Sequence, residues 1–129
     1  MVSQIDLFTS IASLVGSNDK GEDSKNLLPV FLGESNAGRE ELVLEATTRT
    51  AFRKGDWVMI PPYKGPAINK FVNIELGNDT EYQLFNLGSD LSQTKNLATT
   101  EPDKLKSMIA DFEAIRGTEY GKIEALKLK

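Results

Sequence analysis

The side chains best suited to contact a substrate gather between residues 63 and 70. This segment brings one aromatic ring, one amide and two ammonium groups close together: Tyr63, Asn69, Lys64 and Lys70. Ammonium groups attract an anion, and an aromatic ring stacks on an apolar face of a ligand. Long irregular segments are uncommon in compact domains unless they are functional. We therefore predict that these four residues contact a substrate, the alternative being a segment that only covers a sheet.

Composition excludes most other catalytic chemistries. The 129 residues include no cysteine and no histidine. The chain therefore has no thiol nucleophile, no Ser-His-Asp triad, no disulfide and no ligand set for structural zinc or blue copper. Three acidic residues lie near one another, Asp19, Glu22 and Asp23. They lack the alternating spacing of a calcium loop, so we predict a solvated surface there and no metal site.

Charge and hydropathy argue against two kinds of partner. The formal net charge is −4, which gives no general attraction to a phosphate backbone, so no nucleic acid partner is predicted. No apolar run approaches the roughly 18 residues that a membrane-spanning helix needs. The first residues also lack the basic region of a signal peptide. We therefore predict no membrane partner.

Residues 1–32 are predicted to form a helical lead-in. Ser3 followed by Asp6 resembles a capping box, and Gly16 suits the end of the helix that this box opens. The apolar side chains of the helix, over residues 5–15, cover an arc of about 180°, which is wider than the ~100° stripe of a helix with one buried face. We therefore expect this helix to have more than one neighbour.

Two further helices are predicted along the chain. A short helix over residues 27–32 is expected to take Asp23 or Ser24 as its N-cap. The last helix is expected to begin at Thr100, to present one buried face and to end at Gly117.

The central part of the chain is predicted to form a sheet. Alternating and β-favouring residues occupy four segments, 41–46, 48–52, 57–60 and 82–86. Trp57, which starts the third segment, is expected to be largely buried against the last helix. Residues 63–80 are expected to contain little regular structure.

Helices at both ends with strands between them favour the α+β class. We predict a small antiparallel β-sheet of about four strands, packed by a C-terminal amphipathic helix and preceded by one or two N-terminal helices. The whole chain is predicted to be a single domain, with the helical lead-in at 1–32, the sheet and helix at 40–117 and a tail at 118–129.

Several sequence blocks follow one another along residues 2–116: Val2-Ser3-Gln4-Ile5-Asp6-Leu7, Asp23-Ser24-Lys25-Asn26-Leu27-Leu28-Pro29, Arg39-Glu40, Phe52-Arg53-Lys54-Gly55-Asp56-Trp57, Gln83-Leu84-Phe85-Asn86-Leu87, and Asp90 with Asn96-Leu97-Ala98. In this order and spacing they resemble the C-terminal subdomain of the sulfatase family, in its arylsulfatase and N-acetylgalactosamine-sulfatase-like branch. That family is part of the alkaline-phosphatase-like superfamily.

The resemblance implies that this chain is a fragment of a larger enzyme. Sulfatases hydrolyse sulfate esters with a formylglycine nucleophile, made from the motif Cys/Ser-x-Pro/Ala-x-Arg, beside a Ca²⁺ ion and with histidine and lysine side chains at the sulfate. A chain without Cys and His does not carry that set, so we expect no catalytic residue, no metal site and no cofactor in this fragment. The resemblance implies two partners, the catalytic domain of the parent sulfatase and, through the parent, a sulfated glycan. The parent is expected to be periplasmic or secreted.

One segment matches the nucleophile motif by residue type, Ser35-Asn36-Ala37-Gly38-Arg39. In the family this motif continues into a helix, whereas a strand is predicted to begin soon after Glu40 in this chain. The segment also lies just before the C-terminal sheet, which is the wrong place in the family order. We therefore interpret it as a chance match.

Two functions remain open from the sequence. The first is a non-catalytic C-terminal subdomain that braces the large domain of a sulfatase and shapes its substrate cleft through Tyr63, Lys64, Asn69 and Lys70. In this case the apolar arc of residues 5–15 lacks its partner, and the isolated chain is expected to form homo-oligomers. The alternative is a free-standing carbohydrate- or protein-binding module derived from that subdomain.

Overall fold

The computed structural model describes residues 1–46 and 49–117, and the predicted tail at 118–129 lies outside them. The chain forms two compact units, residues 1–41 and the residues from 42 onward. The division falls next to residue 40, where the sequence predicts that the sheet begins. That the two units make one domain stays a prediction.

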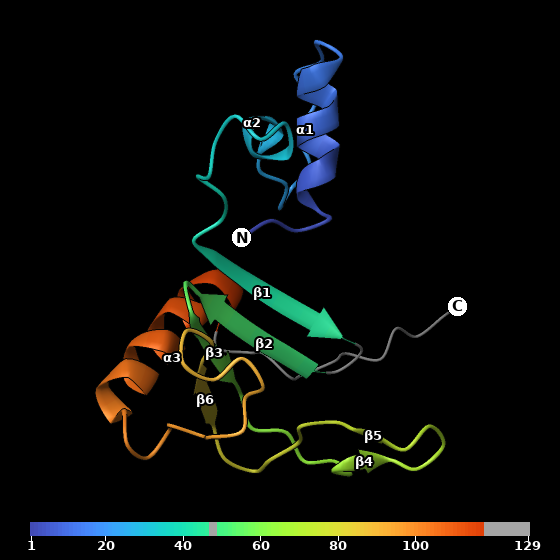
Figure 1. Cartoon of the computed structure of the whole chain (residues 1–129). Coiled ribbons are helices and arrows are strands. Elements are labelled where there is room, and N and C mark those ends of the chain that lie inside the picture. The colour runs from blue at the N-terminus through green and yellow to red at the C-terminus, as the bar shows by residue number, and fades with distance from the viewer. Residues whose placement is uncertain (47–48, 118–129) are drawn as a thin grey trace. The chain divides into compact units, whose positions relative to one another are not determined.

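Residues 1–41 begin with helix α1 (Asp6–Leu14; Figure 1). This helix starts later than the predicted cap at Ser3. The Asp6 carboxylate still accepts the Ser3 N–H at 3.0 Å, which is one of the two hydrogen bonds of a capping box. Gly16 follows the helix with φ +78°, the left-handed conformation that glycine adopts without strain. The predicted end of the helix is therefore confirmed.

Helix α2 (Leu28–Phe31) is shorter than predicted. Pro29 lies in its first turn, where the missing N–H leaves no hydrogen bond unmade. The predicted caps were wrong, because Leu27 occupies the N-cap and makes no side-chain cap. The hydroxyl of Ser24 instead accepts the Thr9 N–H at 3.0 Å and thereby ties the loop to α1.

The interior of residues 1–41 is mostly polar. The buried side chains of α1 are Asp6, Thr9 and Ser10, and among residues 1–41 only Leu27 is a buried hydrophobic residue. The Ser10 hydroxyl accepts the Leu27 N–H at 2.9 Å and donates to the Asp6 carbonyl at 2.6 Å. Thr9 accepts the Gly21 N–H at 3.1 Å. These buried groups are hydrogen-bonded, as burial of a polar side chain requires.

The second unit is built on a four-stranded antiparallel sheet in the order β1-β2-β3-β6 (Figure 1). Its strands are β1 (Glu41–Ala46), β2 (Arg49–Lys54), β3 (Trp57–Ile60) and β6 (Gln83–Asn86). Lys54 pairs with Trp57 across the hairpin turn between β2 and β3, and Trp57 pairs with Asn86 across the next ladder. The predicted α+β class and the number of strands in this sheet are confirmed.

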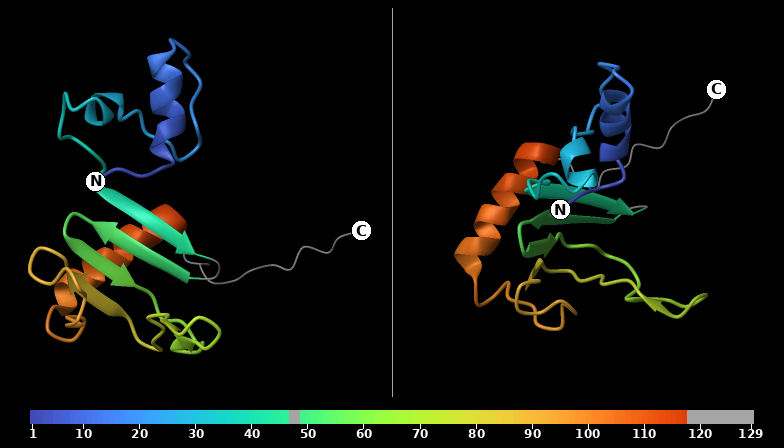
Figure 2. Two further views of the ribbon diagram at one scale, coloured as in Figure 1. Left: turned by 45° about the vertical axis from the view of Figure 1, so that its right-hand side comes forward. Right: turned by 45° about the horizontal axis from the view of Figure 1, so that its top comes forward.

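Helix α3 (Pro102–Arg116) covers one face of this sheet (Figure 2). Phe52, Met59 and Leu84 from the sheet meet Met108 and Phe112 from α3, and these five buried residues form the core. The rings of Phe52 and Phe112 lie 6.0 Å apart between centroids, in a tilted arrangement. The predicted packing of an amphipathic helix on the sheet is thus confirmed.

The two ends of α3 differ in how well the sequence predicts them. Gly117 ends the helix as predicted, with φ +77°. The predicted start at Thr100 was wrong, because the N-cap is Glu101. The Thr100 hydroxyl donates to the Leu97 carbonyl at 3.3 Å and so belongs to the preceding turn.

Trp57 is half-buried, not largely buried as predicted. Its ring packs against the core, and the Lys104 ammonium lies 5.4 Å from the ring centroid. A lysine over an indole face is attracted by the ring quadrupole. Trp57 is the first residue of β3. Its ring therefore lies at the edge of the core, where it contacts both apolar side chains and the charged Lys104 of α3.

Candidate functional site

Between β3 and β6, residues 63–80 form an arm that leaves the sheet (Figure 1). The prediction of little regular structure was wrong in part, because β4 (Ile68–Asn69) and β5 (Ile74–Glu75) pair as an antiparallel ladder. Asn73 lies between these strands with φ 49°, a left-handed conformation that asparagine tolerates better than most residues. The turn residues thus shape the arm into a hairpin.

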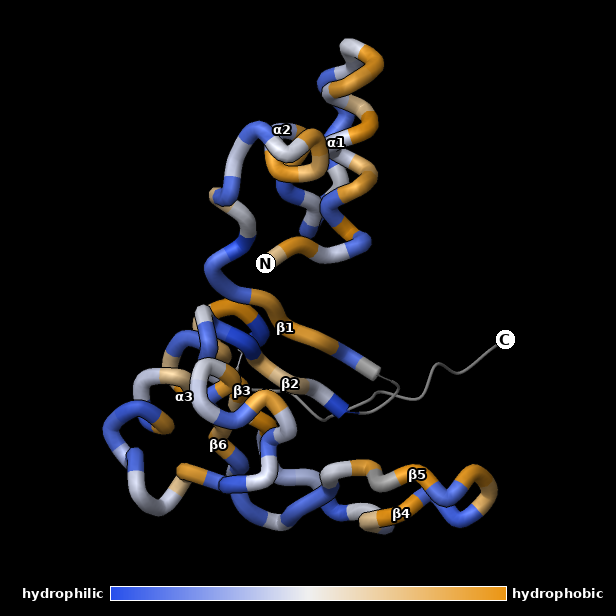
Figure 3. The backbone as a smooth tube through the Cα atoms, viewed as in Figure 1, coloured by the Kyte–Doolittle hydropathy of each residue, from blue (hydrophilic) through white to orange (hydrophobic). Residues whose placement is uncertain are grey.

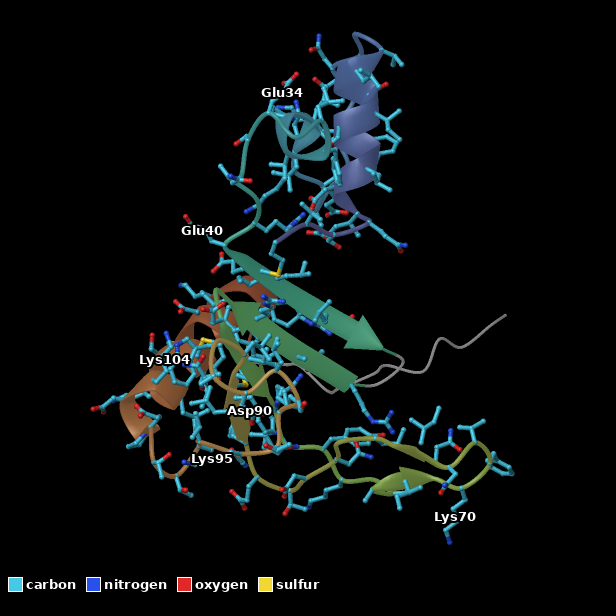
Figure 4. All side chains as sticks on the ribbon, viewed as in Figure 1. Glu34, Glu40, Lys70, Asp90, Lys95 and Lys104 are labelled. Carbon is cyan, nitrogen blue, oxygen red and sulfur yellow. The ribbon has the colours of Figure 1, made fainter. Side chains whose placement is uncertain are left out.

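Two of the predicted site residues, Asn69 and Lys70, lie at the far end of the arm. The Asn69 Oδ1 accepts the Phe71 N–H at 3.1 Å, so this amide oxygen helps to form the turn. Lys70 is exposed, and Figure 4 shows its side chain at the end of the hairpin. The ammonium group of Lys70 is therefore open to a ligand.

The other two predicted residues, Tyr63 and Lys64, lie at the base of the arm. The Tyr63 N–H donates to the Asp79 carbonyl at 2.7 Å. This bond fixes the two sides of the arm against each other. A Cβ atom on Gly65 would lie 2.4 Å from Cε1 of the Tyr63 ring, so only glycine allows the chain to pass that close. Lys64 is exposed.

Arg49, which the sequence analysis did not single out, joins Tyr63 at the base of the arm. Its guanidinium carbon lies 5.3 Å from the centroid of the Tyr63 ring, within the range of a cation–π contact. Its Nε donates to the Asn78 Oδ1 at 2.7 Å. The Asn78 amide in turn donates to the Pro66 carbonyl. The structure therefore divides the four predicted residues into a pair at the base and a pair at the tip.

The arm also carries apolar side chains that are open to solvent. Phe71 is fully exposed, and Ile68, Val72 and Ile74 are about half exposed. Figure 3 shows these hydrophobic positions along the arm. Exposed apolar groups that lie together mark surfaces that contact a partner or ligand. The arm therefore combines a cationic aromatic base with an apolar tip.

The loop between β6 and α3 is held by Asp90 and Asn96. The Asp90 carboxylate accepts the Lys95 N–H at 2.9 Å and the Thr94 hydroxyl at 3.2 Å. The Lys95 N–H is the main reason that the pKa of Asp90 lies below its usual value. The Asn96 Oδ1 accepts the N–H groups of Leu84 and Ala98, both at 3.0 Å. Asp90 and Asn96 therefore hold the backbone of this loop through their side chains.

Helix α1 presents a second surface that is open to a partner. The large apolar side chains that face away from its polar interior are 42–73% exposed; they are Leu7, Phe8, Ile11, Leu14 and Val15. We call these five residues the α1 apolar face. Figure 3 shows the hydrophobic positions along one side of the helix. The apolar arc that the sequence predicts is therefore exposed, because α1 buries its polar side instead.

Arg39, the last residue of the motif-like segment, is bound by the interior of residues 1–41. Its Nε donates to both Asp6 carboxylate oxygens, at 2.8 and 2.9 Å, and its Nη2 donates to Oδ1 at 2.6 Å and also to the Asp23 carbonyl. The Ser35 Oγ accepts the Ala37 N–H at 3.1 Å. These contacts support the interpretation of the motif as a chance match, because its arginine has a structural role.

The charge on Asp6 is stabilised by these contacts. Burial alone would raise the pKa of Asp6. Hydrogen bonds from the Arg39 guanidinium and from the N–H groups of Lys25 and Ser3 outweigh that effect and hold the pKa below its usual value. The side chains of Asp6 and Arg39 are 0% and 7% exposed. This is a buried ion pair in which both carboxylate oxygens of Asp6 accept hydrogen bonds.

In the described part of the chain, no helix is both long enough and apolar enough to cross a membrane.

Comparison with known proteins identifies relatives among the sulfatases. No protein-family profile matches the chain. The N-acetylgalactosamine-6-O-sulfatase of Bacteroides thetaiotaomicron is 34% identical over 120 residues, which are 90% of this chain and 24% of that relative.

Solved structures agree with this relation. One, from work on the metabolism of multiple glycosaminoglycans by Bacteroides thetaiotaomicron (BT33336S-sulf), is 33% identical with a TM-score of 0.81 and matches 88% of this chain and 24% of its own. Another holds its substrate, D-glucosamine-2-N,6-O-disulfate. It is 11% identical with a TM-score of 0.59, over 92% of this chain and 25% of its own, and shows the fold alone. This chain thus spans about a quarter of the length of the relatives that it matches.

Proposed function

This chain is related to the sulfatases and matches about a quarter of their length, and we propose that it is the C-terminal, non-catalytic part of an enzyme that hydrolyses sulfate esters on a sulfated glycan. The observation that carries the proposal is the relation to the solved structure with a TM-score of 0.81. That relation extends over 88% of this chain and leaves about three quarters of the other chain unmatched.

The side chains of this chain do not fit the formylglycine and Ca²⁺ that the sulfatase resemblance implies. The chain has no cysteine, and Arg39 of the motif-like segment is bound to Asp6. Among the described residues, no group of three or more acidic, histidine or cysteine side chains is placed to hold a metal ion. In this proposal the nucleophile and the metal ligands therefore lie in the rest of the enzyme.

The arm is the part of this chain that we assign to the substrate cleft. Tyr63 offers a ring for stacking, and Lys64 and Lys70 offer exposed ammonium groups. Sulfated sugars combine flat apolar ring faces with negative charge, so both kinds of group suit them. One relative is an N-acetylgalactosamine-6-O-sulfatase, which favours an amino sugar sulfate as the substrate class.

The chain alone is expected not to hydrolyse aryl sulfates. A sulfatase needs its nucleophile, metal ion and acid in one pocket, and the residues of this chain do not supply them. A chromogenic aryl sulfate assay on the purified chain is expected to give the rate of buffer. Turnover clearly above buffer that the substitution Ser35→Ala abolishes would contradict the non-catalytic role and make Ser35 the nucleophile.

The DNA sequence upstream of the codon for Met1 tests the same proposal. A reading frame that continues upstream into the motif Cys/Ser-x-Pro/Ala-x-Arg is expected. A stop codon directly upstream, with no such motif, would instead favour the free-standing binding module.

The rest of the enzyme is also the partner that we propose for the α1 apolar face. Covering about 400 Å² of apolar surface is worth roughly 10 kcal/mol before the costs of association. An exposed apolar patch of this kind often marks a surface that contacts a partner. About three quarters of the matched relatives lies outside this chain, which is ample protein to cover it.

Without that partner, the purified chain is expected to self-associate through the α1 apolar face. Light scattering at high micromolar concentration is expected to give a mass above that of a monomer. Phe8→Asp and Ile11→Asp should each restore the monomer, because both side chains are more than half exposed on this face and a carboxylate there opposes apolar contact. Gln4→Asp, which adds the same charge at an exposed position before α1, is the control and should not. A wild-type monomer would favour the free-standing module.

A further inference from the structure

The base of the arm holds an arginine for which no acidic partner lies among residues 1–46 and 49–117. Arg49 is half-buried at the start of β2. Among the described residues, ion pairs join Asp6 to Arg39, Lys54 to Asp111 and Glu45 to Arg116, and Arg49 takes part in none of these three. A guanidinium in a partly buried position usually has an anion beside it, because burial without one disfavours the charge.

The surroundings of Arg49 fix its orientation. The Asn78 Oδ1 accepts the Nε hydrogen at 2.7 Å, and the guanidinium carbon lies over the Tyr63 ring, 5.3 Å from its centroid. The Asn78 amide is itself held by the Pro66 carbonyl. The Nε–H of the guanidinium is thus occupied, and the group is held over the Tyr63 ring. No described residue accepts a hydrogen bond from its two Nη groups, which form the opposite edge.

That free edge has the geometry of an oxyanion site. Two N–H groups of a guanidinium match two oxygens of a sulfate, phosphate or carboxylate group. A side chain that is already held by a stack and a hydrogen bond loses less freedom when it binds. Lys64, next to Tyr63 in the chain and exposed, adds positive charge nearby. Asp79, the acidic residue next to Asn78 in the chain, accepts the Glu81 N–H in its own turn.

We propose that Arg49, stacked on Tyr63 and supported by Lys64, binds a sulfate group of a sulfated sugar. The choice of a sulfated sugar rests on the proposed function, whereas the oxyanion site rests on the contacts of Arg49. The site lies in this chain and contains no nucleophile. The sulfate that it binds is therefore one that positions the sugar, or belongs to a neighbouring sugar unit, and is not cleaved there.

The test is an NMR titration of the whole chain, which follows the Nε–H signals of its arginines and the backbone amides of β2. The probes are N-acetylgalactosamine 6-O-sulfate, N-acetylgalactosamine and glucuronic acid. The sulfated sugar is expected to shift the Arg49 signal and the amides near Tyr63, and the unsulfated sugar is expected to leave them unchanged. Glucuronic acid separates sulfate recognition from general carboxylate binding.

Variants at Arg49 decide the assignment. Arg49→Met is expected to weaken binding about tenfold or more, and Arg49→Lys to recover part of it, since a lysine keeps the charge but loses the two-point contact. Arg53→Met removes a charge from the same strand, where Nε donates to the Gly55 carbonyl, and is expected to bind as wild type. The β2 and β3 amide signals of each variant report whether the sheet is intact.

Three results would overturn the proposal: no shift with the sulfated sugar, equal affinity for glucuronic acid, or equal losses in Arg49→Met and Arg53→Met. None of them bears on whether the complete enzyme hydrolyses sulfate esters, which the upstream sequence and the aryl sulfate assay address. A shift of the backbone amide signals that the sulfated sugar causes in Arg49→Lys but not in Arg49→Met supports the site.

Discussion

Replacing Arg39 with methionine is expected to destabilise residues 1–41 by about 3–5 kcal/mol, because it leaves the buried Asp6 charge without its partner. The pair is joined by hydrogen bonds of 2.6–2.9 Å, and its side chains are 7% and 0% exposed. The same carboxylate accepts the N–H groups of Ser3 and Lys25. Removing the Arg39 guanidinium therefore weakens the point at which the segments of Ser3, Lys25 and Arg39 meet. Hydrogen exchange of the α1 amides measures the effect as a lower free energy of local opening.

Arg53→Met is the matched control for Arg39→Met. The Nε of Arg53 donates to the Gly55 carbonyl at 3.0 Å in an exposed setting, so its loss should change stability by no more than about 0.5 kcal/mol. The double variant Asp6→Leu with Arg39→Met should be more stable than Arg39→Met alone, since neither charge is then buried unpaired. Unchanged protection of α1 in Arg39→Met would show that the pair does not hold this unit.

The same ion pair makes residues 1–41 sensitive to acid. The pKa of Asp6 is lower in the folded chain than the value of about 3.9 expected for an unfolded one. A lowered pKa contributes stability that is complete above the unfolded value and is lost as the pH falls through the folded value. The difference in α1 protection between wild type and Asp6→Asn should therefore be constant above about pH 5 and shrink below about pH 4.

Phe112→Ala is expected to cost about 3–5 kcal/mol in the second unit, because it opens a cavity in the core that the sheet and α3 share. Phe112 is completely buried and contacts the ring of Phe52. Trp57 is the single tryptophan of the chain and packs against this core. Its fluorescence during urea unfolding therefore reports on this unit, and the midpoint should fall.

Ile115→Ala is the control on the same helix. Its side chain is 51% exposed, and a surface substitution of this kind changes stability by about 0.5 kcal/mol or less. Equal losses in Phe112→Ala and Ile115→Ala would contradict a core centred on Phe112 and would place the helix differently on the sheet.

The sheet and α3 could be predicted from the sequence because their signals are local. Alternating residues mark the strands, and turn residues such as Gly55 mark the hairpin between β2 and β3. The apolar spacing that includes Met108 and Phe112 marks the buried face of α3. Each of these patterns lies within a few residues, where periodicity and turn chemistry are informative.

The polar side of α1 could not be predicted in the same way. Patterning assigns apolar side chains to the interior, whereas in α1 Asp6, Thr9 and Ser10 are buried and Phe8 and Ile11 are exposed. The buried groups find partners that are distant in sequence, for example Arg39 for Asp6. One residue-level signal was available, the Ser3 and Asp6 capping box, and it identified the hydrogen bond from the Ser3 N–H to the Asp6 carboxylate.

The proposed oxyanion site lies only in part within the segment that the sequence singled out, for a similar reason. Tyr63 and Lys64 were singled out because an aromatic ring and a lysine are adjacent in an irregular segment. Arg49 and Asn78 were missed because the arm brings them to Tyr63 from opposite sides of the sequence. A contact between residues that are distant in sequence depends on the path of the arm, and that path cannot be predicted from the periodicity of the sequence.

The polar interior of residues 1–41 sets how this unit responds to temperature. Apolar exposure is what gives unfolding its large heat capacity and its steep dependence on urea, and Leu27 is the one buried hydrophobic residue among residues 1–41. We therefore expect the stability of this unit to change less on cooling than the stability of the second unit. The core around Phe52 and Phe112 is built from apolar contacts, which weaken in the cold. In one chain, the stability of residues 1–41 thus depends mainly on pH, and the stability of the second unit depends mainly on temperature.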